Sequence, residues 1–142
     1  MALSIRNALM LITVVLLILL PGSMGSIKRK RIHVTIKNDM SMDLALHCKS
    51  KDDDLGLQIL QPQGDFKFTF WPNVWGTTLY FCTFGWQDQT QDFDIFVQRR
   101  DTTKCSECVW SIIHTGPCRF NSKTGQYDIC YPWKNSLSSL SP

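Results

Sequence analysis

The chain has 142 residues, of which 44% are hydrophobic and 19% are charged, and its net charge is +3 with neutral histidines. This length is typical of a single domain, so it argues against a multidomain enzyme. Aromatic residues make up 11% of the chain, which argues against a disordered protein because disordered segments contain few of them. With this small net charge we expect no clustered basic face of the kind that binds nucleic acid, so we do not expect nucleic acid as a partner.

The N-terminal segment has the order of a secretory signal peptide. Arg6 precedes an apolar stretch at residues 8–20, and small residues that include Ser23 and Gly25 follow it. The apolar stretch is shorter than the roughly 18 residues that suggest a membrane-spanning helix. We therefore predict that residues 1–25 are a signal peptide cut after Gly25, with an uncleaved anchor as the alternative. The remaining 117 residues would then be secreted and would contain no transmembrane segment.

Short polar tails flank the predicted domain at residues 32–134. The N-terminal tail, residues 26–31, contains four consecutive basic residues from position 28 to position 31. Such a run can contact a membrane surface, an acidic partner or a processing protease. A solvated tail is the simpler interpretation because the other charges nearly cancel. The C-terminal tail, residues 135–142, is rich in serine, and we expect it to fray.

Beyond the basic tail, apolar and polar residues alternate with a period of two, which is the pattern of half-buried β-strands. The alternating segments are residues 32–36, 44–48, 55–59, 66–70 and 93–97. Residues 78–84 and 109–113 are apolar or β-branched at nearly every position, so we expect central strands covered on both faces. No window has a sustained helical period. The predicted fold is all-β, a small antiparallel β-sandwich of about seven to nine short strands stabilised by disulfides, with a small barrel as the alternative.

Six cysteines in a secreted chain indicate a disulfide framework, and six cysteines allow 15 complete pairings. Cys118 and Cys130 flank a turn-like segment at residues 121–125. A hairpin centred on Thr124 would place the two cysteines directly opposite each other, within the reach of a disulfide. We therefore predict a Cys118–Cys130 disulfide.

The other four cysteines, Cys48, Cys82, Cys105 and Cys108, would form two further disulfides in one of three pairings. A redox pair or half of a zinc site is the alternative for Cys105 and Cys108. A redox motif normally opens a helix, whereas this pair precedes a strand-like segment, and no histidine lies at a zinc-ligand spacing. We predict no metal or cofactor, and we expect Cys105 and Cys108 to pair separately with Cys48 and Cys82.

A succession of short motifs runs through the predicted domain. The motifs are Asn38, HCKSKDDDLG at residues 47–56, Phe70, GTTLYFC at residues 76–82, Trp86, FDI at residues 93–95, Cys105, and CVW at residues 108–110. This succession resembles the plant self-incompatibility S-protein homologue family, and the resemblance extends from about His33 to Ile113. It implies a secreted β-sandwich with four shared cysteines at positions 48, 82, 105 and 108, to which Cys118 and Cys130 are an addition. The founding members, the poppy stigmatic S proteins, are pistil ligands recognised by a pollen membrane receptor.

We therefore expect a monomeric extracellular signalling ligand that a cell-surface receptor recognises, with a pollen–pistil role as one form of this function. Recognition is expected on the loops that a rigid sandwich presents, namely residues 49–54, 72–76, 85–91 and 99–107. The candidate contact residues are Asp52, Asp53, Asp54, Asn73, Trp75, Gln87, Asp88, Arg100 and Asp101.

Two of these expectations have alternatives at the level of single residues. The three adjacent aspartates could bind calcium, but a calcium loop usually alternates its ligands, so we favour a solvated turn. The five tryptophans, at positions 71, 75, 86, 110 and 133, could be exposed contacts. We favour packing in the core or at an edge for each of them.

Two alternative functions are less well supported by the sequence. A cationic defence protein that acts on membranes would use the basic tail, but the chain lacks an amphipathic helix. A small secreted hydrolase would draw on His33, His47 and His114, with Asp94, Asp101 or Glu107 as partners. No spacing brings these groups within hydrogen-bonding reach, so we predict no catalytic residues.

Overall fold

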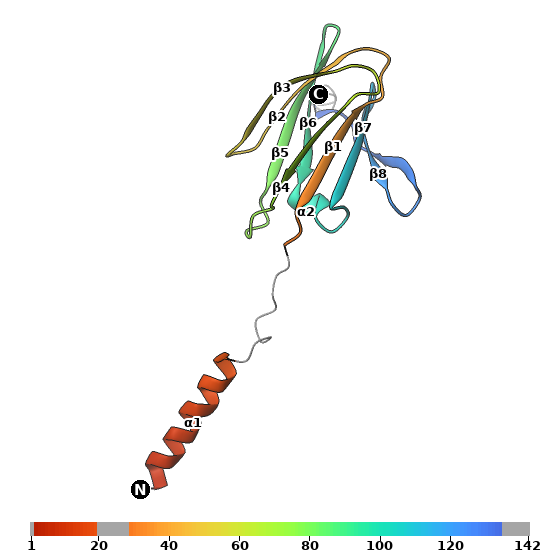
Figure 1. Cartoon of the computed structure of the whole chain (residues 1–142). Coiled ribbons are helices and arrows are strands. Elements are labelled where there is room, and N and C mark those ends of the chain that lie inside the picture. Colours follow the sequence, from red (N-terminus) through yellow and green to blue (C-terminus); the bar gives the residue numbers. More distant parts are fainter. Residues whose placement is uncertain (1, 20–28, 135–142) are drawn as a thin grey trace, which may run out of the picture.

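The computed structural model describes residues 2–19 and 29–134 (Figure 1). The first element is helix α1 (Ala2–Leu19), which contains most of the apolar stretch of the predicted signal peptide. In the described part of the chain, no helix has the length and hydropathy that crossing a membrane requires. The predicted cleavage after Gly25 and the tail at residues 135–142 lie outside the described residues.

Residues 32–130 form a two-layered β-sandwich, which confirms the predicted fold class. The five-stranded sheet has the order β4 (Asp65–Phe70), β1 (Ile32–Asn38), β7 (Glu107–Ile113), β8 (Gly116–Asn121) and β9 (Gln126–Cys130). The four-stranded sheet has the order β3 (Asp54–Leu60), β2 (Leu44–Lys49), β5 (Leu79–Trp86) and β6 (Gln89–Val97). A single turn of helix, α2 (Gln98–Asp101), connects β6 to β7. This helix is too short to produce a helical period in the sequence.

One strand pair departs from the antiparallel expectation, because β1 and β7 are parallel and place Ile36 opposite Trp110. The other strand pairs in the described residues are antiparallel. The parallel pair follows from the path of the chain. Strand β6 ends at the end of the sandwich where β1 begins, so α2 lies at that end too. From there β7 has to run in the same direction as β1.

The core lies between the sheets and is built from alternate residues of the strands. In β1, for example, Ile32, Val34 and Ile36 are each at most 1% exposed. Asn38 closes this row as a buried polar residue: its side-chain amide donates to the carbonyl oxygens of Met42 and Leu60, and its side-chain oxygen accepts from Met40 N–H. The amide group therefore replaces backbone partners where the chain leaves β1.

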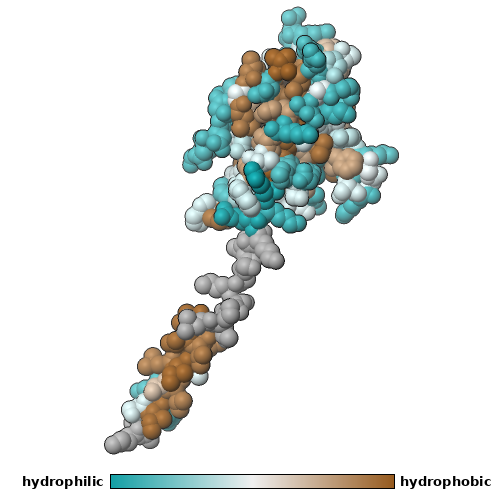
Figure 2. Space-filling model, in the orientation of Figure 1, coloured by the Kyte–Doolittle hydropathy of each residue, from teal (hydrophilic) through white to brown (hydrophobic). Residues whose placement is uncertain are grey.

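The two strands predicted to be central are both interior strands of their sheets. In β7 three successive residues, Trp110, Ser111 and Ile112, are buried. The prediction of burial on both faces is wrong for β5, where Leu79 and Phe81 are exposed together with Leu57 and Ile59 on the neighbouring part of the sheet. No described element covers the outer face of the four-stranded sheet, and Figure 2 shows hydrophobic side chains among hydrophilic ones in this region.

The structure joins Cys118 to Cys130, the pair that the hairpin geometry predicts, and the two residues are direct register partners in β8 and β9. The expected division of Cys105 and Cys108 between Cys48 and Cys82 is wrong. Cys48 lies opposite Cys82 on the adjacent strands β2 and β5, with a Cα–Cα distance of 4.0 Å, and forms a disulfide with it. Cys105 and Cys108 then bond to each other where β7 begins.

The tryptophans divide into two groups. Trp86, Trp110 and Trp133 are at most 4% exposed, as expected for core residues. The expectation of packing is wrong for Trp71 and Trp75, which are 57% and 83% exposed. Both lie in the segment that connects β4 to β5, where the chain turns outside the two layers.

Candidate functional site

Several predicted recognition residues meet at one end of the sandwich, which we call the loop end. It is formed by residues 50–53 between β2 and β3, residues 71–78 between β4 and β5, and α2 (Figure 1). The strand register brings these segments together, because Lys49 at the end of β2 pairs with Phe81 and Val97 at the end of β6 pairs with Leu79.

A groove of about 990 Å³, which we call the loop groove, lies at this end between residues 50–53 and 69–81. Of the nine predicted contact residues, four line it: Asp52, Asp53, Asn73 and Trp75. Two loops that are more than 15 residues apart in the sequence therefore contribute to one surface.

Tyr80 connects the groove to the core. Its ring is buried against Phe68 and Phe70, with centroid distances of 5.0 and 4.5 Å. Its hydroxyl donates to Asp53 Oδ2 over 3.2 Å. Burial raises the pKa of Tyr80 above its ordinary value of 10.0, and the negative charge of Asp53 acts in the same direction. The neutral phenol therefore positions the Asp53 carboxylate at the groove.

A compact network of hydrogen bonds holds residues 71–78. The side chain of Asn73 donates to Thr77 Oγ1 and accepts from Thr77 N–H, while the Asn73 N–H donates to Thr78 Oγ1. Gln98 of α2 donates to the Asn73 carbonyl and accepts from Thr78 N–H. Gly76 permits the reversal with φ +75°, a value that side chains disfavour. The loop thus presents exposed apolar side chains on an ordered backbone.

Asp54 lies outside the groove, although it follows Asp53 in the sequence. It accepts hydrogen bonds from His47 Nε2 and from Gly56 N–H. These bonds, that from His47 first, hold the pKa of Asp54 below its usual value of 3.8. The three adjacent carboxylates therefore have different partners. Among the described residues, no group of three or more His, Cys, Asp or Glu side chains is placed to hold a metal ion.

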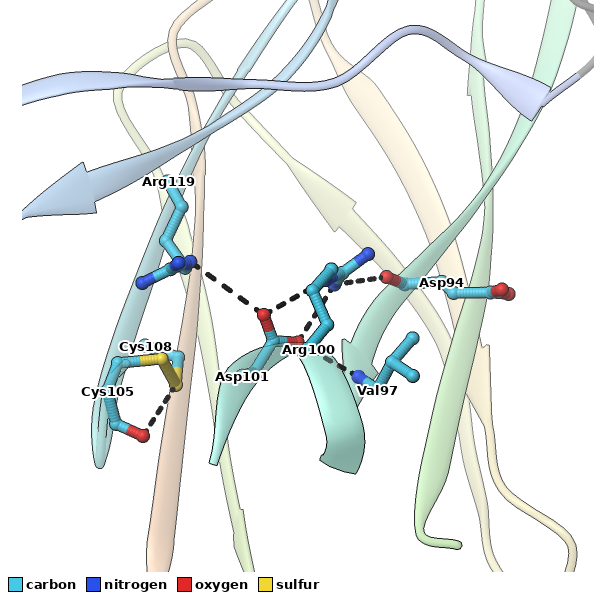
Figure 3. The surroundings of a disulfide bond; sticks show 7 residues. All are labelled: Asp94, Val97, Arg100, Asp101, Cys105, Cys108 and Arg119. Atoms are coloured by element: carbon cyan, nitrogen blue, oxygen red, sulfur yellow. Dashed lines mark hydrogen bonds and ion pairs between the residues drawn. A yellow bond between two sulfur atoms is a disulfide. The ribbon is translucent and has the colours of Figure 1, made fainter. Parts of the chain in front are cut away.

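The remaining predicted contact residues, Gln87, Asp88, Arg100 and Asp101, do not line the loop groove. Gln87 and Asp88 form the exposed turn between β5 and β6, at the end of the sandwich opposite the loop end. Asp101 is fully buried and accepts hydrogen bonds from Arg100 and from Val97 N–H (Figure 3). The prediction that Asp101 contacts a partner is therefore wrong, because its carboxylate is needed to compensate the neighbouring arginine inside the fold.

The three histidines considered for catalysis do not share a site. His33 approaches Glu107 at 3.8 Å, His47 bonds to Asp54, and the ring of His114 packs at 6.0 Å against Trp86. These contacts lie on different strands and turns.

Sequence reasoning missed Trp71 and Tyr80 as groove residues. The nearly continuous apolar run at residues 78–84 predicts that Tyr80 is buried, but only the fold shows that its hydroxyl reaches Asp53. Trp71 carried one usable signal, since it lies between the strand residue Phe70 and the turn residue Pro72.

Comparison with known proteins identifies the family. Residues 33–133 match the family described as "Plant self-incompatibility protein S1". S-protein homolog 2 from Arabidopsis thaliana is 50% identical over 111 residues, covering 73% of this chain and 69% of that protein. S-protein homolog 3 from the same plant is 41% identical over 112 residues, covering 76% and 75%.

A solved structure has the same fold. It is a structure of SPH (Self-Incompatibility Protein Homologue) proteins, which are described as a widespread family of small, highly stable, secreted proteins from plants. It matches with a TM-score of 0.50 and 22% identity over 66% of this chain and 87% of that chain. Sequence and fold together lead to one conclusion: the chain belongs to the plant self-incompatibility S1 family, the S-protein homologues.

Proposed function

We propose that this protein is an extracellular ligand whose loop groove binds a cell-surface receptor protein. In this proposal residues 1–25 direct secretion and are removed after Gly25. The mature protein is a monomer that acts without catalysis or a cofactor. Expression in the stigma would place the recognition between pistil and pollen, whereas expression in roots or seeds would place it in another signalling process.

The exposure of Trp75 is the observation that carries the proposal. It is 83% exposed, with Val74 at 65% and Trp71 at 57% in the same loop. Exposed tryptophans are uncommon on a soluble protein and are enriched among the residues that dominate protein–protein binding energies. The carboxylates of Asp52 and Asp53 border this apolar surface, as polar groups surround the centre of many interfaces.

The ordered conformation of residues 71–78 also supports the proposed binding of a receptor. The Asn73 and Gln98 hydrogen bonds join residues 71–78 to α2, which follows β6. A surface that is already ordered loses less conformational entropy when a partner binds.

A cell-binding assay tests the proposal. Labelled protein, recovered from the medium of plant cells that express the full chain, is added to protoplasts from stigma, root and seed. We expect saturable binding that protease treatment of the protoplasts abolishes. Trp75→Ala should lower the affinity by about tenfold or more, because it removes the more exposed of the two tryptophans that line the groove.

Ile59→Ala is the matched control, since Ile59 is a large apolar side chain that is 59% exposed on β3 and does not line the groove. It should leave the affinity unchanged. Absence of saturable binding at micromolar concentration in all three tissues, or equal loss in both variants, would contradict the proposal. Equal binding to protein-free anionic vesicles would support the membrane-active alternative instead.

A further inference from the structure

A second pocket lies where the two sheets do not match in width. The five-stranded sheet extends through β8 and β9, whereas the four-stranded sheet ends at β6. Arg119 of β8 is the register partner of Trp110 in β7, so its side chain points to the same face of the sheet as this core residue. Arg100 and Tyr131 line the pocket together with Arg119.

Arg119 is a buried cation whose internal contacts are one long ion pair, with Asp101, and one cation–π contact, with its guanidinium carbon 5.9 Å from the centre of the Trp110 ring. Its side chain is 4% exposed, and no described residue accepts a hydrogen bond from its Nε. The nearest carboxylate oxygen, Asp101 Oδ1, is 3.9 Å from this nitrogen. Figure 3 shows Arg100 and Arg119 on different sides of Asp101. Burying a charged group without hydrogen-bond partners is unfavourable, so an acceptor at this site would stabilise the arrangement.

Asp101 is already occupied by the other arginine. Arg100 donates from Nε to Asp101 Oδ1 and from its terminal nitrogen to Oδ2, both over 2.9 Å. Val97 N–H donates to Oδ2 over 2.9 Å as well. This bidentate pairing compensates the charge of Arg100 with the carboxylate of Asp101, which is the one fully buried carboxylate among the described residues. The charge of Arg119 therefore lacks a dedicated partner.

The pocket beside Arg119 has a volume of about 400 Å³ and carries a concentrated positive charge. Lys104 and Lys123 line it with the two arginines, and its described lining contains no carboxylate. Neither lysine forms an ion pair with a described residue. Asn121 and Ser122 add polar groups to the lining. Three cations, at positions 104, 119 and 123, thus face one small space, and the only ion pair that any of them forms with a described residue is the 3.9 Å contact of Arg119 with Asp101, a carboxylate already shared with Arg100.

We propose that this pocket, which we call the arginine pocket, binds a multiply charged tetrahedral oxyanion, a sulfate or phosphate group. The guanidinium of Arg119 would donate to its oxygens from inside the fold, and Lys104 and Lys123 would contribute charge at the surface. Arg100, Lys104, Arg119 and Lys123 have one buried carboxylate among them, that of Asp101, and this excess of positive charge favours a group with more than one negative charge over a single carboxylate. This site is separate from the loop groove and does not rest on the proposed receptor function.

An NMR titration tests the proposal. ¹⁵N-labelled protein, secreted by yeast cells that express the full chain, is titrated separately with sodium sulfate, sodium phosphate and sodium acetate against sodium chloride of equal ionic strength. We expect saturable shifts of the Arg119 Nε–H and the backbone N–H groups of residues 121–123, with a dissociation constant of about 1 mM or lower for sulfate or phosphate. The anion with the lower dissociation constant shows whether the pocket favours a sulfate or a phosphate group.

Variants locate the site. Lys104→Ala combined with Lys123→Ala should weaken binding by about tenfold, since two exposed cations are removed without disturbing the core. Arg119→Met should abolish the saturable shifts. Lys37→Ala combined with Lys67→Ala removes the same charge from β1 and β4, outside the pocket, and should leave the dissociation constant unchanged.

Three results would overturn the proposal. The first is no saturable shift by sulfate or phosphate at concentrations well above the millimolar range. The second is acetate binding as tightly as the tetrahedral anions. The third is equal weakening in the two lysine double variants, which does not depend on whether the Arg119 variant folds.

Discussion

At the scale of single residues, Tyr80 shows how one side chain serves both the core and the surface. Its ring packs against Phe68 and Phe70, while its hydroxyl donates to Asp53 at the loop groove. The packing of the Tyr80 ring in the core therefore fixes the position of its hydroxyl, and this hydroxyl in turn holds the carboxylate of Asp53 at the surface. The apolar run at residues 78–84 predicts the buried ring, but the hydroxyl's partner is 27 positions away and follows only from the strand register.

The raised pKa of Tyr80 predicts a loss of stability at alkaline pH. An unfolded tyrosine ionises near pH 10.0, whereas the folded one ionises at higher pH. The contribution of neutral Tyr80 is thus fully present below pH 10 and is lost as the pH rises towards the folded pKa. Tyr80→Phe should cost about 1 kcal/mol at pH 7 through the missing hydrogen bond.

The free energy of unfolding, measured by urea denaturation between pH 7 and pH 11.5 with tryptophan fluorescence, checks this. The difference between wild type and Tyr80→Phe should shrink above pH 10, because only the wild type can ionise at this position. A difference that stays constant or grows over this range would contradict the assignment.

At the scale of elements, the hairpin of β8 and β9 could be predicted because it is local. Cys118 and Cys130 are 12 positions apart with one turn between them, so the symmetry of a hairpin identifies the pair. The Cys48–Cys82 bond joins strands that are not consecutive, since β3 and β4 intervene. Its pairing depends on which strands are neighbours in the sheet, and periodicity contains no information on strand order.

When both cysteines of a disulfide are replaced by alanine, the loss of stability should increase with the length of the chain segment that the disulfide closes and with the burial of the disulfide. Cys48–Cys82 spans 34 positions and both its residues are at most 1% exposed, so its removal should cost about 4 kcal/mol. Removal of Cys118–Cys130, with 12 positions, should cost about 3 kcal/mol. Cys105–Cys108 spans only 3 positions and should have the smallest effect.

Urea denaturation of the three double variants at neutral pH gives these values. This ranking assumes that a disulfide stabilises the fold by restricting the unfolded chain. If the variant without Cys105 and Cys108 is less stable than the variant without Cys48 and Cys82, the assumption is contradicted.

At the scale of the whole molecule, the sandwich separates surfaces that resemble one another in sequence. The polar turns at residues 50–53 and 87–88 both connect neighbouring strands, yet they lie at opposite ends. Only the first borders the exposed tryptophans. The two ends should therefore contribute unequally to receptor binding.

The protoplast assay can measure this difference. Asp52→Ala should lower the affinity by about threefold, the effect of an exposed charge at the border of an interface. Gln87→Ala combined with Asp88→Ala should leave the affinity within about twofold of wild type. An equal or larger loss in the double variant would place the receptor contact at the other end of the sandwich.

The sequence by itself determined the fold class, most strand positions, the Cys118–Cys130 pair and the family resemblance, because these depend on alternation, on local turns and on short motifs. Tertiary structure decided the parallel pairing of β1 with β7, the other two disulfides, the burial of Asp101 and the exposure of Trp71 and Trp75. Each of these depends on which segments become neighbours in the fold; even Cys105 and Cys108, three positions apart, are left to bond to each other because Cys48 faces Cys82 on the adjacent strands β2 and β5. The free energy that selects the neighbouring strands comes from packing two sheets across a shared core, and no single window of the sequence contains all the strands that meet there.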